Sequence, residues 1–411
     1  MPQYETKVSV EDLKVGMYVC RLDRPWIETH FLFQGFHISN DSDMQELRRT
    51  CEYVFVDPAR GAEPDSRPLQ PLPQRTKPIG EEIFRSAPGQ HVYPVVTSMD
   101  EELQAARDSR AGTLAEVSSI LEDLKAGRKI QIESVRRLVT PMVASIVRNP
   151  DAFLWLTRLK DKDSYAYAHC VDASSLAVAF GRHLGFPQRD LETLAIGTLL
   201  FDIGKLQLPD AILTKPGRLS EKEFALIRRH VEFGVQIVEE MHGSNSDIVS
   251  TVAYHHERHD GKGYPHGLSG KRIPVYGRIA ALVDCYDAIT SERPYSEAMS
   301  AHDAVHLIYE WRGKDFQADM VEQFIQCIGV FPAGTLVELS TGEVGIVIAQ
   351  NRVRRLKPRI MLVLDSSKVA LEFNPILDLI DNPVDSEGRP VEIRQPLMPG
   401  SYGIQASDFY L

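Results

Sequence analysis

The chain has 411 residues, a formal net charge of −11 at pH 7, 43% hydrophobic residues and 25% charged residues. This length is enough for two to three domains of ~100–200 residues, each able to bury a core. The acidic balance argues against a binder of nucleic-acid polymers, although a local basic pocket for a small anion is compatible with it. Five cysteines without a CxxC pair favour a reducing compartment, so we expect a cytoplasmic protein. No stretch approaches the ~18–20 apolar residues that a membrane span requires, so no membrane span is expected.

The first part of the chain alternates apolar and polar residues, with Gly16 and Gly35 as turns. This pattern predicts a small strand-rich N-terminal module over residues 1–62, interpreted as regulatory. Five prolines within residues 64–78 then predict a stiff, extended linker over residues 63–97.

Apolar residues next recur at helical spacing, which predicts connecting helices over residues 98–148. The two stripes are Leu114, Val117, Leu121 and Leu124, followed by Val135, Leu138, Met142 and Ile146. One interpretation is that both stripes pack on the neighbouring domain. The alternative is a short dimerising coiled coil, which would make the protein a homodimer.

The remainder of the chain divides into a helical part and a β part. Residues 149–331 show helix after helix with short polar turns, which predicts an all-α domain. Strand-like runs around a Thr-Gly turn predict a small β unit over residues 332–381, and the Pro- and Gly-rich residues 382–411 predict an irregular tail. The expected fold class is therefore mainly α, a multi-helix bundle flanked by the N-terminal module and a C-terminal β unit.

Histidines and carboxylates recur within the apolar helical stretches of the predicted all-α domain. In chain order they are His169, Asp202, His230, His255, His256 and Asp284. A single histidine on such a face is more often a satisfied core residue than a ligand. Burying this many uncompensated polar groups, however, would cost ~1–3 kcal/mol each. A metal cluster compensates them together, and mixed imidazole and carboxylate ligands favour Fe, Mn, Ni or Zn over Ca²⁺.

Three neighbouring segments carry a specific pattern: "FDIGKLQLPDAILTKPGRLSEKE", "HHERHDGKGYP" (255–265) and "RIAALVDCYDAITSERPYSEAM". Together they resemble the HD-GYP phosphodiesterase family over roughly residues 150–331, which implies an HD-superfamily helical bundle. The earlier "VGMYVCRLDRPWIETHFLFQGF" resembles a domain of uncharacterised role that often precedes such modules in bacteria. Members of the family hydrolyse the second messenger cyclic di-GMP to pGpG, in some cases on to GMP, with two or three metals bridged by a hydroxide.

The resemblance implies two divalent transition metals in this chain, iron or manganese in the first place, with nickel or zinc as alternatives. Asp202 would bridge both metals. The further ligands would be His230, His255 and His256 at one metal, and His169 and Asp284 at the other.

The resemblance also implies residues that act on the substrate. Lys205 would contact the scissile phosphate and act in catalysis beside Asp202, and its alternative role is a solvated lysine at a helix end. Tyr264 would hold the nucleotide by stacking or through its hydroxyl, Arg293 would hold it by charge, and Asp287 would help from the same region.

Four residues depart from the family pattern. Ser296 stands where a Lys that contacts phosphate is common, His259 takes the place of a frequent Trp, and the other two bear on the metals. Phe201 replaces the histidine of the His-Asp pair, and Tyr165 stands where three-metal members carry a Glu ligand. A third metal is therefore not expected. His169, Asp202 and Asp284 still offer three ligands, and catalytic metals often keep three protein ligands plus water. We expect two metals, one bound more weakly, and the alternative is a decayed site.

Three functions are compatible with these residues. The main hypothesis is an active cyclic di-GMP phosphodiesterase. The second is a binding protein that holds cyclic di-GMP without cutting it and signals to protein partners. The third is a phosphohydrolase for another nucleotide, since one scaffold serves several substrates.

Overall fold

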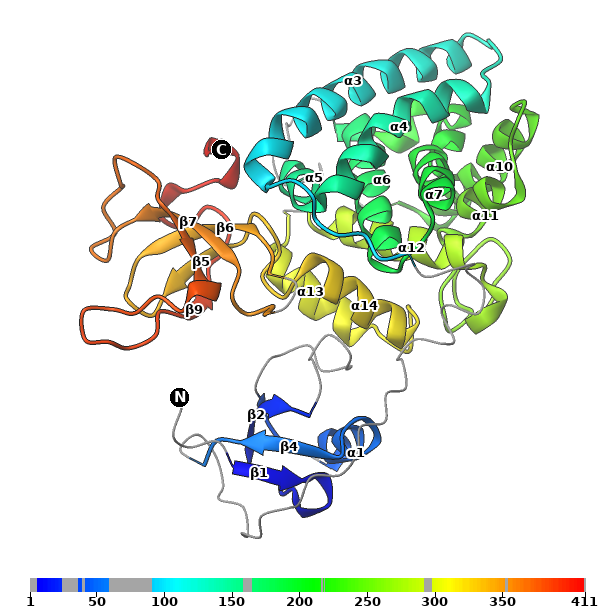
Figure 1. Cartoon of the computed structure of the whole chain (residues 1–411). Coiled ribbons are helices and arrows are strands. Elements are labelled where there is room, and N and C mark those ends of the chain that lie inside the picture. Colours follow the sequence, from blue (N-terminus) through cyan, green and yellow to red (C-terminus); the bar gives the residue numbers. More distant parts are fainter. Residues whose placement is uncertain are drawn as a thin grey trace.

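The computed structural model describes residues 6–23, 36–38, 41–58, 91–157, 165–215, 217, 219–291, 298–351 and 354–409. Figure 1 shows a small N-terminal sheet, a large helical bundle and a C-terminal sheet, in this order along the chain. The predicted fold class is therefore confirmed. No helix among these residues is long and apolar enough to cross a membrane.

The N-terminal part is a four-stranded antiparallel sheet, in the order β1-β4-β2-β3, with one helix packed on it. Val54 and Val56 of β4 and Leu47 of the helix lie in its separate core. The strands are as predicted, but the helix is not among the predicted elements because its sequence is mostly polar. The elements are β1 (Thr6–Ser9), η1 (Val10–Asp12), β2 (Tyr18–Leu22), β3 (Phe36–His37), α1 (Asp41–Thr50) and β4 (Tyr53–Val56).

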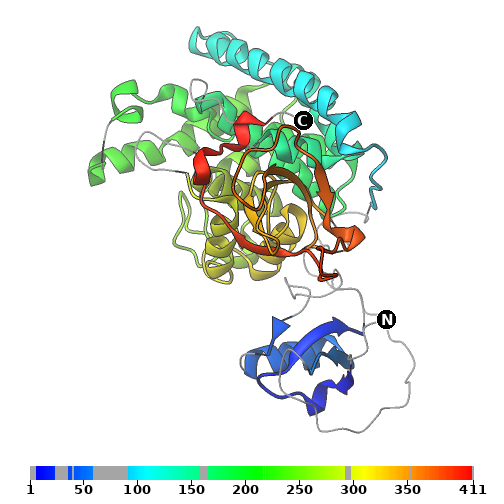
Figure 2. The ribbon, with the colours of Figure 1, turned by 90° about the vertical axis from the view of Figure 1, so that its left-hand side faces the viewer.

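Two long helices, α3 (Met99–Lys125) and α4 (Ile132–Arg148), cover one side of the bundle, with α3 along its outer edge (Figure 1, Figure 2). α3 begins at a capping box formed by Ser98 and Glu101. The second apolar stripe is fully buried in the main core. Of the first stripe, Val117 is buried and the other residues are partly buried against the same core. The interpretation that both stripes pack on the neighbouring domain is confirmed.

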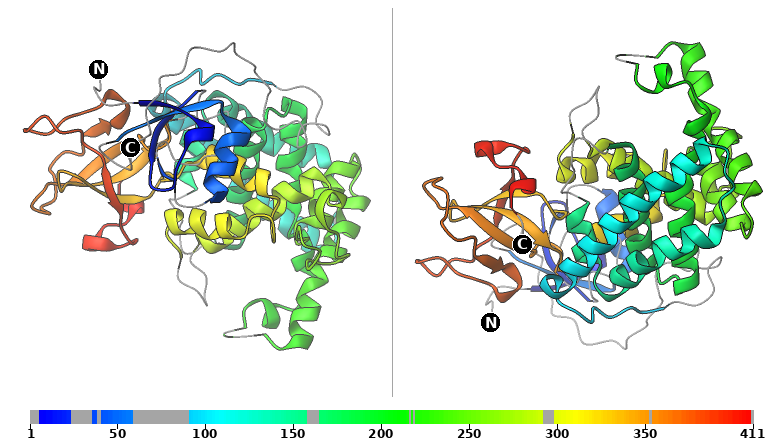
Figure 3. Two further views of the ribbon diagram at one scale, coloured as in Figure 1. Left: turned by 90° about the horizontal axis from the view of Figure 1, so that it is seen from below. Right: turned by 90° about the horizontal axis from the view of Figure 1, so that it is seen from above.

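The bundle is organised around helix α6 (Tyr165–His183), which is buried from Ala168 to Arg182. It packs against α3, α4, α7 (Gln188–Leu200) and α12 (Val275–Ile289). Figure 3 shows the segment that holds α8 and α9 projecting from the bundle. The remaining bundle elements are α5 (Pro150–Leu156), α6 (Tyr165–His183), α7 (Gln188–Leu200), η4 (Ile203–Gln207), α8 (Asp210–Leu213), α9 (Glu221–Arg228), α10 (His230–Glu240), α11 (Ser246–Tyr254), η5 (Gly270–Arg272), α12 (Val275–Ile289), α13 (Ala301–Glu310) and α14 (Ala318–Ile328).

A buried ion pair joins α3 to α6. Arg110 donates to Asp172 Oδ1 from Nε at 3.1 Å and from Nη2 at 2.9 Å, and the Asp172 side chain is completely buried. Removing one partner of a buried pair leaves an uncompensated charge. We expect Asp172→Ala to lower the free energy of unfolding by about 3 kcal/mol, measured by urea denaturation.

The control for this variant is Asp123→Ala on helix α3, the helix that carries Arg110. Asp123 pairs with Arg128 at the surface, where both side chains are at least 40% exposed. Exposed pairs contribute about 0–1 kcal/mol, so this variant is expected to stay close to the unsubstituted protein. If Asp172→Ala and Asp123→Ala lowered the free energy of unfolding equally, the buried Arg110–Asp172 pair would contribute no more to stability than an exposed pair.

The C-terminal part is a five-stranded sheet in the order β8-β7-β6-β5-β9, so the predicted β unit is confirmed. The expected irregular tail is corrected in one respect, because β9 pairs antiparallel with β5. A four-residue strand with polar neighbours carries no strand signature of its own, and its partner strand defines it. The elements are β5 (Leu336–Leu339), β6 (Val344–Ala349), β7 (Arg359–Leu364), β8 (Ile376–Asp378), η6 (Leu379–Asp381), β9 (Ile393–Pro396), η7 (Ser401–Gly403) and η8 (Ala406–Asp408).

Candidate metal centre

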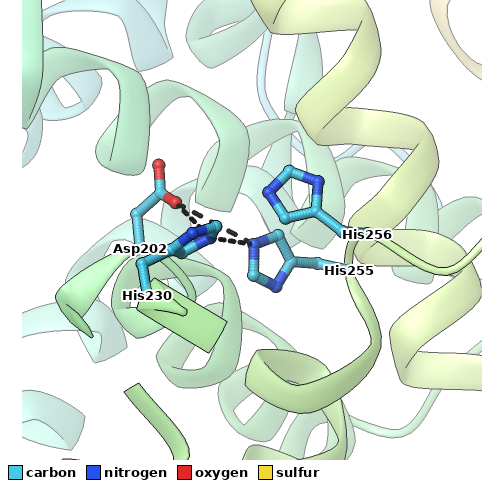
Figure 4. Close-up of side chains that lie close together, drawn as sticks. All are labelled: Asp202, His230, His255 and His256. Carbon is cyan, nitrogen blue, oxygen red and sulfur yellow. Dashed lines mark hydrogen bonds and ion pairs between the residues drawn. The ribbon is translucent and has the colours of Figure 1, made fainter. Parts of the chain in front are cut away.

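Four of the predicted metal ligands come together where three helices end or begin (Figure 4). Asp202 lies between α7 and η4, His230 is the first residue of α10, and His255 and His256 follow α11. One ligand atom from each lies within 4.8 Å of the others. This group is called the four-ligand group below.

Glycine allows two of these elements to approach closely. A Cβ atom at Gly204 of η4 would lie 1.9 Å from the His230 carbonyl oxygen and 2.4 Å from the Gly234 nitrogen. Any other residue would force η4 away from α10. The close approach places His230 Nε2 3.4 Å from Asp202 Oδ1.

The protonation of two histidines in the four-ligand group fits a bound cation. His230 Nδ1 lies 2.7 Å from the Ile227 carbonyl, and His255 Nδ1 lies 2.7 Å from the Val252 carbonyl. Each Nδ1 must therefore carry the proton, which leaves both Nε2 atoms with bare lone pairs, 3.3 Å apart. Burial, together with the neighbouring His230, lowers the pKa of His255 to about 4, so its ring stays neutral. Two facing lone pairs beside the Asp202 carboxylate form a donor set for a metal ion.

A second half of the site lies around His169 on α6. Its Nε2 is 3.1 Å from Asp284 Oδ1 and 3.9 Å from Asp202 Oδ2. Burial lowers the pKa of His169, but the hydrogen bonds with Asp284 and Asp287 outweigh it and raise the pKa to about 9. The Asp202 carboxylate thus faces the four-ligand group with one oxygen and the His169 half with the other.

Asp287 contacts His169 in the structure. Its side chain is completely buried, and its Oδ2 accepts from His169 Nδ1 at 2.7 Å, on the ring edge that faces away from Asp284. Asp287 is therefore placed to orient His169, as outer carboxylates orient metal-binding histidines, and its help in holding the nucleotide stays a prediction.

Phe201 lies between the two halves of the site. Its ring is completely buried, 5.6 Å from the His169 ring and 4.9 Å, edge to face, from the His255 ring. An apolar ring therefore fills the position from which an imidazole could reach the His169 half. Phe201 thus gives this position a buried side chain that has no metal-binding atom.

Lys205 is paired within the site. Its Nζ lies 2.5 Å from Asp202 Oδ2, while 41% of its side chain is exposed. Burial opposes ionisation of Asp202, but Lys205 holds the pKa of that carboxyl well below its usual range. The ammonium is thus at the mouth of the site, bound to the carboxylate oxygen that faces the His169 half.

The Gly-Tyr-Pro loop packs beside the four-ligand group, with the Tyr264 ring stacked on His256 at 4.6 Å. Burial and the carboxylates of Asp284 and Asp202 raise the pKa of Tyr264, so its hydroxyl stays protonated. A Cβ atom at Gly263 would lie 2.4 Å from the Arg258 nitrogen, so glycine is required there as well.

One residue of this loop has a role that sequence reasoning missed. The carboxylate of Glu257 is buried and accepts from the backbone N–H groups of His266 at 2.7 Å and Leu268 at 2.9 Å. It therefore anchors the segment that carries Tyr264. A glutamate directly after two histidines is a signal that could have suggested it. Arg293 lies outside the described residues, as does the side chain of Tyr165.

Comparison with known protein families matches residues 147–319 to the HD domain and residues 5–135 to a domain of unknown function (DUF3391). A cyclic di-GMP phosphodiesterase of Pseudomonas aeruginosa is 33% identical over 368 residues, 89% of this chain and 87% of that protein.

Two further relatives match shorter stretches. The cyclic di-GMP phosphodiesterase response regulator RpfG of Xanthomonas campestris is 30% identical over 253 residues, 60% of this chain and 65% of that protein. The 3′3′-cGAMP-specific phosphodiesterase 2 of Vibrio cholerae is 33% identical over 143 residues, 34% of this chain and 27% of that protein. Given the extent of the Pseudomonas match, this chain belongs to the HD-GYP family of cyclic di-GMP phosphodiesterases.

Proposed function

We propose that this protein hydrolyses a phosphodiester bond of cyclic di-GMP to give pGpG, with a further step to GMP left open. The observation that carries the proposal is the pair of bare, facing Nε2 atoms of His230 and His255 beside Asp202. The match over nearly the whole length of a cyclic di-GMP phosphodiesterase supports the choice of substrate.

The protein is proposed to use two divalent transition metals, iron or manganese in the first place and nickel or zinc as alternatives. When bound, such ions lower the pKa of water and neutralise charge on a phosphate. The proposed ligands are Asp202, His230, His255 and His256 for one ion, and Asp202, His169 and Asp284 for the other.

The chain's own groups orient and neutralise the substrate. Lys205 is proposed to exchange its bond with Asp202 for one with a phosphate oxygen, as a compact positive charge. Asp287 keeps the proton of His169 on Nδ1, so that Nε2 faces Asp284 and Asp202. The Tyr264 ring offers a face and a protonated hydroxyl to the nucleotide, and Arg293 is proposed to add a further charge.

The cellular setting is proposed on fewer observations. The five widely spaced cysteines without a CxxC pair support a cytoplasmic location. Removal of cyclic di-GMP would place the protein in bacterial signalling that controls biofilm formation and motility. A homodimer, signalling protein partners and the domain limits given above stay predictions. The stripes expected of a coiled coil are packed in this chain's own core.

The function is tested by a chromatographic time course of cyclic di-GMP with anaerobically purified protein, with metal content determined on the same samples. We expect pGpG to form with repeated turnover in protein loaded with Mn²⁺ or Fe²⁺ and to stop on chelation. Intact nucleotide that is bound by metal-loaded protein would contradict hydrolysis and favour the receptor alternative.

A further inference from the structure

A row of planar groups leads away from the four-ligand group toward helix α9. Tyr264 stacks on His256, and the guanidinium of Arg228 lies over the ring of the same tyrosine, with its Cζ 4.9 Å from the ring centroid. Phe224, one turn earlier on α9, holds that guanidinium from a second side at 4.4 Å. The row therefore runs His256, Tyr264, Arg228, Phe224.

Arg228 carries a charge that its own surroundings do not neutralise. It is exposed, and among the residues that the structure describes no carboxylate forms a salt bridge with it. The adjacent Arg229 differs, because it pairs with Glu232 at 3.7 Å. In a chain with a net charge of −11, an unpaired cation beside the metal centre attracts an anion.

The geometry of this arginine suits a phosphate. Two aromatic rings lie within 4.9 Å of the Arg228 Cζ, which restricts the positions that the guanidinium can take. A planar guanidinium can donate two parallel hydrogen bonds to a phosphate group. Because the side chain is already fixed by Tyr264 and Phe224, little of its rotamer freedom is lost on binding.

We infer that Phe224, Arg228 and Tyr264 form a subsite for the second phosphate of a cyclic dinucleotide, the one that is not being cut. This inference rests on the proposed function, which brings the first phosphate to the metals. A cyclic dinucleotide carries two phosphodiester groups and two negative charges, so the charge remote from the metals requires a partner of its own. Arg228 supplies that partner next to Tyr264.

The inference is tested by comparing two substrates, cyclic di-GMP and bis(4-nitrophenyl) phosphate, which has a single phosphodiester. For Arg228→Gln we expect kcat/KM for cyclic di-GMP, divided by kcat/KM for bis(4-nitrophenyl) phosphate, to fall by about tenfold or more. The fall should come mainly from a higher KM for cyclic di-GMP. A change of this size is the effect of one lost charge-assisted hydrogen bond. Arg228→Lys keeps the charge and is expected to recover part of the ratio. Arg229→Gln is the matched control and should keep the ratio of the unsubstituted protein.

Direct binding of cyclic di-GMP, measured by calorimetry on the same proteins, separates this inference from the proposed function. Weaker binding by Arg228→Gln in a protein without turnover would support the subsite and refute hydrolysis. If Arg228→Gln and the unsubstituted protein bound cyclic di-GMP with equal affinity and hydrolysed it equally fast, the subsite would be refuted and the proposed hydrolysis would stand. If Arg228→Gln lowered kcat/KM equally for cyclic di-GMP and bis(4-nitrophenyl) phosphate, the subsite would also be refuted, because Arg228 would then only stabilise the loop that carries Tyr264.

Discussion

Asp202→Ala is expected to abolish the hydrolysis of cyclic di-GMP, with kcat/KM reduced by at least about a thousandfold, or ~4 kcal/mol. The reason is the position of this carboxylate between the two halves of the site. Its Oδ1 lies 3.4 Å from His230 Nε2, and its Oδ2 lies 3.9 Å from His169 Nε2. Without it, no shared carboxylate joins the halves and Lys205 loses its partner. Bound metal per chain, measured by mass spectrometry, should fall with the activity.

The control for Asp202→Ala is Asp210→Ala at the exposed start of helix α8. This variant removes the same charge from a nearby exposed position and should keep its metal and its activity. Circular dichroism should show that both variants are folded. If Asp202→Ala retained more than about a tenth of the activity, ~1.4 kcal/mol of transition-state stabilisation, the reaction would not depend on this centre.

Phe201→His is expected to strengthen metal binding in the His169 half of the site, with a metal Kd lower by about tenfold or more. The ring occupies a buried position between His169 and His255, so an imidazole there faces the same space. Without metal, the new polar group is buried and unpaired, which costs about 1–3 kcal/mol. We therefore expect a lower melting temperature in metal-free protein and a larger rise on metal addition than in the unsubstituted protein. Thermal melts across a Mn²⁺ titration measure both effects.

Phe201→Leu is the matched control for that variant, because it removes the aromatic ring without adding a ligand. It should lose some stability through imperfect packing and show the ordinary response to metal. If Phe201→His and Phe201→Leu responded equally to metal, position 201 would not reach the ion. Higher turnover of Phe201→His at limiting metal would show that the natural phenylalanine reduces metal occupancy without abolishing the reaction.

The sequence predicts the proximity of residues in the four-ligand group better than in the half of the candidate metal centre around His169. His255 and His256 are adjacent in a specific motif, so their proximity follows from the chain itself. Asp284 and Asp287 lie three residues apart on one helix face, and spacing alone does not decide which side of His169 each one meets. The packing of α12 against α6 decides it, placing Asp284 at Nε2 and Asp287 at Nδ1.

Parts of the fold were unpredictable for a related reason. Helix α1 is mostly polar, and strand β9 covers only Ile393–Pro396, so neither has a strong periodic signal. The sequence did not indicate Arg228 as a binding residue either, because arginines are common on exposed helices and its place two residues before His230 is no signal by itself. Only the fold brings it against Tyr264, 36 positions later in the sequence.

The two halves of the candidate metal centre also differ in the length of the chain segment that separates their contacting residues. The His230–His255 contact joins residues 25 positions apart, whereas the bond between His169 and Asp287 joins residues 118 positions apart. By the logarithmic dependence of loop entropy on length, the longer closure costs about 1.4 kcal/mol more. We therefore expect the four-ligand group to form earlier in folding than the His169 half, whose contacts join more distant parts of the bundle. Folding order thus favours the same half of the site that Phe201 leaves with its full set of ligands.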